Sequence, residues 1–205
     1  MSRETFQMIR NTNISNPEIQ LALQCAPLLT GLKISNLFSV NNDSARYTEG
    51  LFKGSGILCF ILRVTDERTT FLLYRPDKLS EYLKTEKVRR LLDMLGYQDS
   101  NLKRVLSVFR KRYEGFMGSG LPFPHELGLL LGYPVEDVNG FIVNRGKNFL
   151  YAGYWKVYEN LPEKLNLFEN FNKAKDVVTR FVLCGGSILE ILKACNEKKL
   201  QIAAI

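Results

Sequence analysis

The chain has 205 residues, of which 45% are hydrophobic and 24% charged, and its formal net charge is +7 at pH 7. This is enough chain to bury a sizeable core, and the composition excludes a largely disordered polypeptide. The first 13 residues lack the apolar core of a signal peptide, and the longest apolar runs, such as 56–62, are too short to span a bilayer. We therefore predict one domain, 1–205, in a cytoplasmic protein that makes no membrane contact.

Helical and β patterns are interspersed along the first 96 residues. Apolar residues recur at helical spacing after a start signal at Asn16–Pro17, and two short helical patterns follow Pro76 and end at Gly96. Two nearly continuous apolar runs flank the polar turn 65–68, which predicts a hairpin in a sheet covered on both faces. In chain order, the predicted elements are a helix over 16–27, a strand over 36–40, a surface loop over 41–46, strands over 57–64 and 69–75, and helices over 76–83 and 88–95.

The positive charge is concentrated in one region. Between Lys84 and Arg112 there are nine basic residues and three acidic ones, so this segment alone carries +6. A helix predicted from about 99 to 114 has an apolar stripe on one side, and Arg104, Arg110 and Lys111 lie off that stripe. These residues form either a solvated helix face or a surface that contacts anions. No zinc-finger, RNP or helix-turn-helix motif accompanies the charge, so a small anionic ligand is favoured and duplex DNA is an unfavoured partner.

The next segment, 115–124, is the candidate hinge and the candidate anion site. Its glycines free the backbone to turn N–H groups outward, and Pro124 is well placed as the first residue of a helix. The amides of Gly118, Ser119 and Gly120, together with the dipole of that helix, could then hold an anion. The only histidine, His125, falls in the first turn of the predicted helix, where it could bind a ligand or act as a base. A plain connector between two helices is the alternative interpretation.

Acidic residues follow this histidine but form no recognisable catalytic or metal-binding motif. Glu126, and Asp137 after Pro134, suit the first turns of helices, and the H-E-x-x-H pattern is absent because position 129 is leucine. If the protein is an enzyme, His125 would be its general acid or base, supported by Glu126, Glu136 or Asp137. The lone histidine and four cysteines without a C-x-x-C pair lead us to expect no metal and no cofactor. We predict buried, reduced thiols, with Cys25 as the one that could be partly exposed.

The last third of the chain completes the predicted fold. Residues 148–158 are rich in aromatic residues and predict a further strand, on which Tyr154 and Trp155 could stack against a ligand base. Long and short helices are predicted over 162–183 and 187–195. Four strands among seven or eight helices, without regular βαβ alternation, predict an α+β fold with a small, mostly antiparallel sheet.

Two motifs resemble an uncharacterised family of cytosolic proteins from anaerobic Gram-positive bacteria, known only as a domain of unknown function. The longer motif is Phe-Pro-His-Glu-Leu-Gly-x-x-Leu-Gly-Tyr-Pro-x-Glu-Asp-Val over 123–138, and the other is Gly-Tyr-Trp-Lys-Val-Tyr over 153–158. Cys25-Ala-Pro, Gly31-Leu-Lys and Leu73-Tyr-Arg fit the same pattern, so the resemblance spans most of the chain. Members of the family often carry histidine where this chain has Gln24. The resemblance implies no activity.

Three functional hypotheses remain open. We favour a non-catalytic protein that captures a phosphate-bearing small molecule, such as a nucleotide or a nucleotide-like signal, with a basic pocket. Its candidate ligand-binding residues are Gly118, Ser119, Gly120, His125, Arg104, Arg110, Lys111, Tyr154 and Trp155. The first alternative is an interaction module or inhibitor that docks an acidic protein surface on its basic face. The second is an enzyme that uses His125 as general acid or base.

Overall fold

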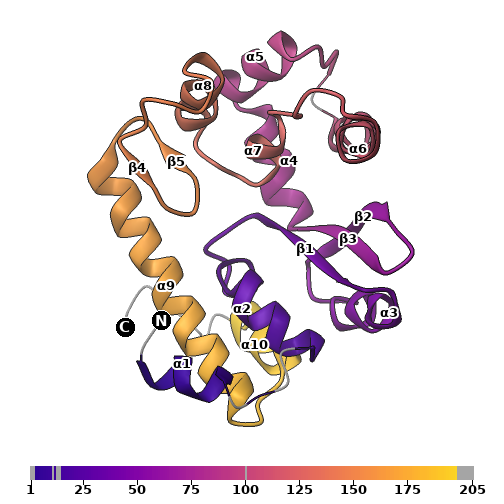
Figure 1. Ribbon diagram of the computed structural model, residues 1–205, viewed down its shortest axis with the longest axis vertical. Coiled ribbons are helices and arrows are strands. Elements are labelled where there is room, and N and C mark those ends of the chain that lie inside the picture. Colours follow the sequence, from indigo (N-terminus) through magenta and orange to yellow (C-terminus); the bar gives the residue numbers. More distant parts are fainter. Residues whose placement is uncertain (1–2, 11, 13–14, 100, 198–205) are drawn as a thin grey trace.

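The structure is a computed structural model, and it describes residues 3–10, 12, 15–99 and 101–197. These ranges hold ten helices and five strands, and strands gather in small antiparallel sheets, so the predicted α+β class is confirmed (Figure 1). The helices are α1 (Arg3–Arg10), α2 (Pro17–Leu29), α3 (Asn42–Leu51), α4 (Pro76–Lys84), α5 (Glu86–Met94), α6 (Leu102–Ser119), α7 (Leu127–Leu130), α8 (Val135–Val143), α9 (Leu161–Leu183) and α10 (Ile188–Asn196). The strands are β1 (Ser35–Asn41), β2 (Leu58–Val64), β3 (Arg68–Tyr74), β4 (Tyr151–Ala152) and β5 (Lys156–Val157).

The main sheet is antiparallel throughout, with the order β1-β3-β2. The hairpin predicted around the polar turn is confirmed as β2 and β3. Because successive side chains of a strand point to opposite faces, β3 sends Phe71 and Leu73 to one side and Leu72 and Tyr74 to the other. All four are buried, as expected for a central strand with helices on both faces.

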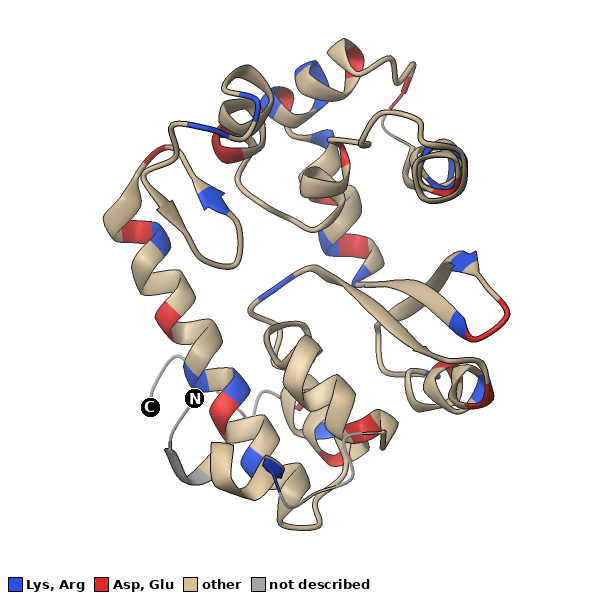
Figure 2. Ribbon diagram, viewed as in Figure 1, with Lys and Arg blue, Asp and Glu red and all other residues tan. Residues whose placement is uncertain are grey.

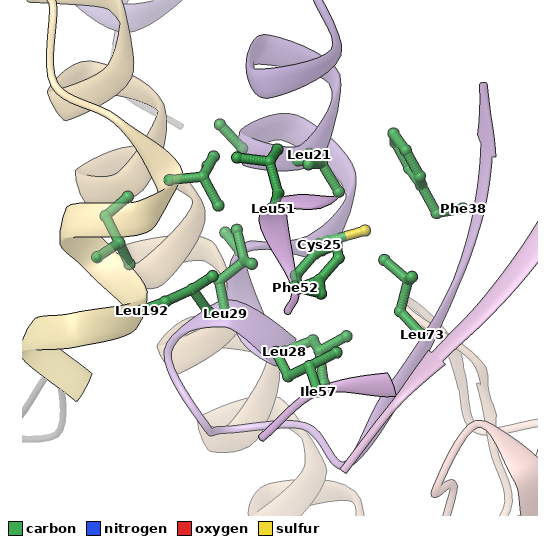
Figure 3. Close-up of a cluster of buried hydrophobic side chains, with 14 of the residues drawn as sticks. Leu21, Cys25, Leu28, Leu29, Phe38, Leu51, Phe52, Ile57, Leu73 and Leu192 are labelled. Atoms are coloured by element: carbon green, nitrogen blue, oxygen red, sulfur yellow. The ribbon is translucent and has the colours of Figure 1, made fainter. Parts of the chain in front are cut away.

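One face of the sheet packs against α2, the last turns of α9, and α10. Figure 3 shows this cluster, with Leu21, Cys25, Leu28 and Leu29 of α2 near Phe38 of β1 and Leu73 of β3. Leu51 and Phe52, from the end of α3, close the same cluster.

The other face packs against α4 to α8, and a third cluster joins the β4–β5 hairpin to the first half of α9. The 23-residue α9 therefore connects both ends of the molecule, since its Phe168 and Phe171 contact the hairpin and its Val178 contacts the α2 cluster (Figure 1). The assignment of all 205 residues to one domain stays a prediction.

Two elements differ from the sequence prediction because tertiary contacts decide them. The surface loop predicted over 41–46 is wrong, since α3 begins at Asn42, whose side chain donates hydrogen bonds to the carbonyls of Thr65 and Asp66 in the β2–β3 turn. The single strand predicted over 148–158 is also wrong, because the segment folds back as the two-residue strands β4 and β5. A Cβ on Gly153, in the turn between them, would lie 2.5 Å from the Phe168 ring, so this turn packs directly on α9.

The glycine-rich turn that we predicted over 115–124 is wrong for its first half, 115–119. Helix α6 continues through Gly115 and Gly118 to Ser119, and Gly120 ends it with a left-handed φ of 66°. Gly115 suits its helical position because the Leu121 side chain folds back to within 2.5 Å of where a Cβ would stand. Helix α7 begins at Leu127, so His125 lies in a turn before this helix and outside its first turn.

Candidate functional site

A cavity of about 330 Å³ lies between the segment before α7, helices α7 and α8, and β5. Five of its lining side chains carry rings, and they come from the segment before α7, the connection between α7 and α8, α8 itself, and the turn before β5. We call it the aromatic pocket, and its ring-bearing residues are Phe123, His125, Tyr133, Phe141 and Trp155. Most of the remaining lining is aliphatic, from Leu127, Leu131 and Val138, and Asp137 and Lys156 supply the charged groups.

Asp137 positions the wall of the pocket. Its carboxylate is 2% exposed and accepts three hydrogen bonds, from the Trp155 indole N–H at 2.7 Å and from the backbone N–H groups of Tyr158 and Glu159 at 2.7 and 3.2 Å. A buried carboxylate needs such donors, because a charge left without partners in the protein interior is costly. Asp137 therefore links the β4–β5 hairpin to α8, and both of its carboxylate oxygens already accept hydrogen bonds within the protein.

Aromatic packing holds the two largest rings of the pocket. Tyr133 and Trp155 stack with centroids 4.8 Å apart, and Trp155 meets Phe168 of α9 edge to face at 4.6 Å. Lys33, in the connection between α2 and β1, lies with its Nζ 5.4 Å from the Tyr133 centroid and donates a hydrogen bond to the Asn36 side chain. Burial lowers the Lys33 pKa to about 8. The pocket thus rests on a layer of packed rings, which keeps its shape fixed.

His125 is the polar group of the pocket without an assigned partner. Its ring packs against Phe123 and Phe141, with centroid separations of 5.4 and 5.8 Å. Its Nδ1 is buried and makes no hydrogen bond to any part of the chain that the structure describes. An unpaired buried nitrogen costs about 1–3 kcal/mol, and such a group is typically explained by an ordered water, an ion or a functional role.

Lys156 provides positive charge at the same pocket. Its Nζ donates to the Gly146 carbonyl at 2.7 Å and lies 4.7 Å from the Phe149 ring and 5.7 Å from the Phe141 ring. No carboxylate of the described residues pairs with it, nor with the exposed Arg145 and Lys147 on either side of Gly146. This edge of the pocket therefore attracts anions.

A second cavity of about 330 Å³ lies on the other side of Phe123 and His125. Glu126 lines it, is 2% exposed, and accepts hydrogen bonds from the Tyr97 hydroxyl at 2.8 Å and from Arg112 at 3.1 Å. Burial and the adjacent Glu126 carboxylate raise the pKa of Tyr97. Glu126 therefore joins α5, α6 and α7 as a structural acid, and like Asp137 it is already fully engaged.

The structure does not bring the predicted basic face to the aromatic pocket. Arg104 pairs with Asp99 and Arg110 pairs with Glu114 along α6, Lys111 is exposed, and none of the three lines either cavity. Figure 2 shows both blue and red residues on α5 and on α6, which is seen end-on. Arg112 is the member of the basic segment that reaches the second cavity.

The other predicted ligand-binding residues divide into two groups. His125 and Trp155 line the aromatic pocket, whereas Tyr154 turns away and packs on Phe168 and Phe171 of α9. The predicted anion site at Gly118–Gly120 lies in the last turn of α6 and its cap, where the Gly120 N–H is bonded to the Gly115 carbonyl. These residues line neither cavity.

Sequence reasoning missed Phe123, Tyr133, Phe141 and Lys156 as pocket residues. The first two stand inside the long motif, and Lys156 stands inside the Gly-Tyr-Trp-Lys-Val-Tyr motif, so motif membership was the available signal. Phe141 carried no such signal, because only the packing of α8 against the hairpin turns its ring into the cavity.

The cysteines do not form a reactive or metal-binding group in the part of the chain that the structure describes. Cys25, the thiol that we considered could be partly exposed, is completely buried, as predicted for the cysteines in general, and burial raises its pKa to about 12. Cys184 is instead the exposed one. No three His, Cys, Asp or Glu side chains of the described residues lie close enough to hold a metal ion. None of the helices described is long and apolar enough to cross a membrane.

Comparison with known proteins gives a family but no activity. No curated protein and no solved structure shows significant similarity to this chain. Residues 21–192 match a family described as "Protein of unknown function (DUF3793)", and this range includes every residue of the aromatic pocket. Since the match covers most of the chain, the protein belongs to the DUF3793 family.

Proposed function

We propose that this protein captures a small molecule that carries a planar ring and an anionic group, with the ring in the aromatic pocket and the anion at Lys156. A phosphate-bearing compound such as a nucleotide, the ligand favoured from the sequence, fits this description. One observation carries the proposal, namely a preformed cavity of about 330 Å³ lined by five ring-bearing side chains. Ligand sites are typically concave and largely apolar, with a few placed polar groups.

The chemistry of the pocket limits what the ligand can be. Trp155 and Asp137 satisfy each other, so His125 is the group left to form a hydrogen bond with a ring substituent. The volume is near the lower end of the usual range for ligand pockets, about 300–1,000 Å³, so it suits the ring alone. The anionic group would then lie outside, where Lys156, Arg145 and Lys147 provide unpaired positive charge.

Binding explains the site better than catalysis does. A histidine that acts as general acid or base needs a carboxylate or another group to orient it. The two acids nearest to His125 in sequence and in the pocket, Glu126 and Asp137, are held by Tyr97 and Arg112 and by the hairpin. We therefore retain His125 as a ligand contact.

We place this activity in the cytoplasm of a bacterium. The resemblance found in the sequence implies this origin, and free cysteines are typical of a reducing compartment. Burial raises the pKa values of Cys25 and of the partly buried Cys59 and Cys195, which makes their reactive thiolate forms still rarer at neutral pH.

The experiment uses Trp155, the only tryptophan, as a reporter inside the pocket. The protein is titrated with nucleoside monophosphates, the matching nucleosides and simple aromatic carboxylates, while fluorescence and the melting temperature are recorded. We expect quenching and a rise of several degrees for compounds that have both a ring and an anion, and a weaker effect for nucleosides.

Variants distinguish binding in the aromatic pocket from a general attraction of anions to the positively charged protein. Lys156→Gln should weaken binding about tenfold, which corresponds to about 1.4 kcal/mol, whereas Lys103→Gln on α6 should leave it unchanged. Val138→Phe should fill the cavity and abolish binding. If no ring-bearing anion changes either signal at millimolar concentration, or if Lys103→Gln matters as much as Lys156→Gln, the proposal is wrong.

A further inference from the structure

A continuous segment of the chain, 138–158, combines positive charge with apolar residues and contains no acid. It carries Arg145, Lys147 and Lys156, together with six aromatic residues, and the flanking acids are Asp137 and Glu159. Figure 2 shows blue but no red along the ribbon between α8 and β5. The 84–112 region carries more net charge but includes three acids, whereas 138–158 has three basic residues and no acid.

Large apolar side chains are exposed to solvent from the last residue of α8, through the connection, to the first residue of β4. Val143 is 70% exposed, Leu150 57%, Tyr151 45% and Phe149 41%. We call residues 143–151 the apolar loop, and Figure 1 shows it at the periphery of the molecule. Single exposed apolar residues are ordinary, but several within one short loop, flanked by cations, indicate an interaction surface.

The backbone conformation of the apolar loop and its hydrogen bonds to neighbouring elements fix the loop with its apolar side chains exposed. Arg145, Gly146 and Asn148 all have left-handed φ angles, between 51° and 71°. The Gly146 carbonyl accepts a hydrogen bond from the Lys156 ammonium, and the Gly146 N–H donates one to the Phe141 carbonyl. The Leu150 N–H donates a hydrogen bond to the Val157 carbonyl. The loop is thus tied to α8 and β5 while its apolar side chains point outward.

We propose that the apolar loop docks the protein on the surface of an anionic lipid bilayer. Aliphatic and aromatic side chains would enter the boundary between headgroups and acyl chains, and Arg145 and Lys147 would contact the lipid phosphates. Aromatic residues and arginine occur at both kinds of interface, but lysine is depleted at protein–protein interfaces and leucine and valine are under-represented among their hot spots. Exposed aliphatic and aromatic residues flanked by lysine and arginine are typical of membrane interfaces. This favours lipid over an acidic protein as the occupant.

This surface shares Arg145 and Lys147 with the ligand proposal, whereas its apolar residues Val143 and Leu150 do not line the aromatic pocket. A substitution at Leu150 therefore tests the surface without touching the proposed ligand contacts. The surface also differs from the expectation that the protein makes no membrane contact, which rested on the lack of spanning segments. A loop that docks on the surface needs no such segment.

The test measures cosedimentation of the full chain with vesicles. Vesicles of phosphatidylcholine alone are compared with vesicles that contain about a quarter phosphatidylglycerol, at low and high salt. We expect binding to the anionic vesicles, weakened by salt, and little binding to the neutral ones. No binding to anionic vesicles at low salt overturns the proposal.

Matched variants test the loop itself. Arg145→Gln with Lys147→Gln should weaken vesicle binding about fivefold for each cation removed, and Lys103→Gln with Lys111→Gln on α6 is the charge control. Leu150→Ser should weaken it about tenfold or more, whereas Met94→Ser, which changes a 79% exposed residue on α5, should not. Circular dichroism and the melting temperature verify that each variant is folded.

The remaining outcomes are equally decisive. If the control variants weaken vesicle binding as much as the loop variants do, the attraction is a general effect of net charge and the proposal fails. If polyglutamate binds through Arg145 and Lys147 while vesicles do not, the loop docks an acidic protein and the lipid assignment is refuted.

Discussion

The strongest prediction concerns the hydrogen bonds of Asp137, which hold one wall of the aromatic pocket. In Asp137→Asn, the remaining carbonyl oxygen can still accept the backbone N–H groups of Tyr158 and Glu159. The new amide group, however, faces the Trp155 indole N–H, so a donor meets a donor where the carboxylate now accepts at 2.7 Å.

The size of the effect follows from this single lost bond. A hydrogen bond to a charged group contributes about 1.5–3 kcal/mol, and burying the unpaired donors adds to the loss. Since Asp137 and Trp155 are both buried, water cannot replace the bond. We expect Asp137→Asn to lower the free energy of unfolding by about 2–4 kcal/mol, and the melting temperature by about 2–4 °C for each kcal/mol.

A double-mutant cycle with Trp155→Phe isolates the interaction, with urea unfolding followed by circular dichroism. Trp155→Phe removes the N–H donor and keeps an aromatic ring. In that background, Asp137→Asn should cost about 1 kcal/mol or less, so the coupling energy should be about 2 kcal/mol. An equal cost in both backgrounds would refute the reasoning, because the loss would then not arise from the indole N–H.

Three further predictions concern buried groups outside the pocket wall. Burial lowers the Lys33 pKa from 10.5 to about 8, so below pH 8 the charged amine is disfavoured in the folded state by about 3 kcal/mol. Lys33→Met should therefore stabilise the protein by about 1–3 kcal/mol at neutral pH. This advantage should shrink as pH rises from 8 to 10.5 and be lost above 10.5, because the amine is then neutral in both states. Urea unfolding across this range measures the advantage, and an advantage that grows with pH would contradict the sign. Gly132→Ala should lower the free energy of unfolding by about 2–4 kcal/mol, because the φ of Gly132 is +69° and an added Cβ would lie 2.4 Å from Ile34. Gly118→Ala, in the open last turn of α6, should be neutral or stabilising by up to about 1 kcal/mol. Thermal melting compares the two variants, and an equal loss of stability would rule out the clash. In urea unfolding, Glu126→Ala should destabilise the protein by about 3 kcal/mol and Glu126→Gln by about 1 kcal/mol. Equal losses would show that the hydrogen bonds from Tyr97 and Arg112 are not the source of the stability.

The sequence was most informative where the signal is local. The β2–β3 hairpin, the long α9, and α10 after its glycine break all follow from residues within one element and its flanks. It was misleading where a tertiary contact overrides the local preference. Asn42 begins α3 in polar sequence because the β2–β3 turn accepts its side chain, and α6 continues through Gly115 because Leu121 packs over that glycine.

For the candidate site, the sequence located the region but not the arrangement. It singled out His125 and Trp155, which do line the aromatic pocket, but it joined them with α6 cations that the structure places elsewhere. A signal for the cations that lie nearer was present in the sequence, since 138–158 contains three basic residues and no acid. A count of charge over short windows would have found it.

By itself, the sequence determined the α+β class, most of the helices, the central hairpin and the positions of charge along the chain. Only the tertiary structure decided which polar side chains form hydrogen bonds or ion pairs within the protein and which remain free to contact a ligand. Asp137 with Trp155 and Glu126 with Tyr97 join residues 18 and 29 positions apart, and Lys33 meets Tyr133 across a still longer separation. Side-chain spacing determines helices and strands because their hydrogen bonds and buried faces repeat locally, whereas the pairing of buried polar groups depends on which elements pack together.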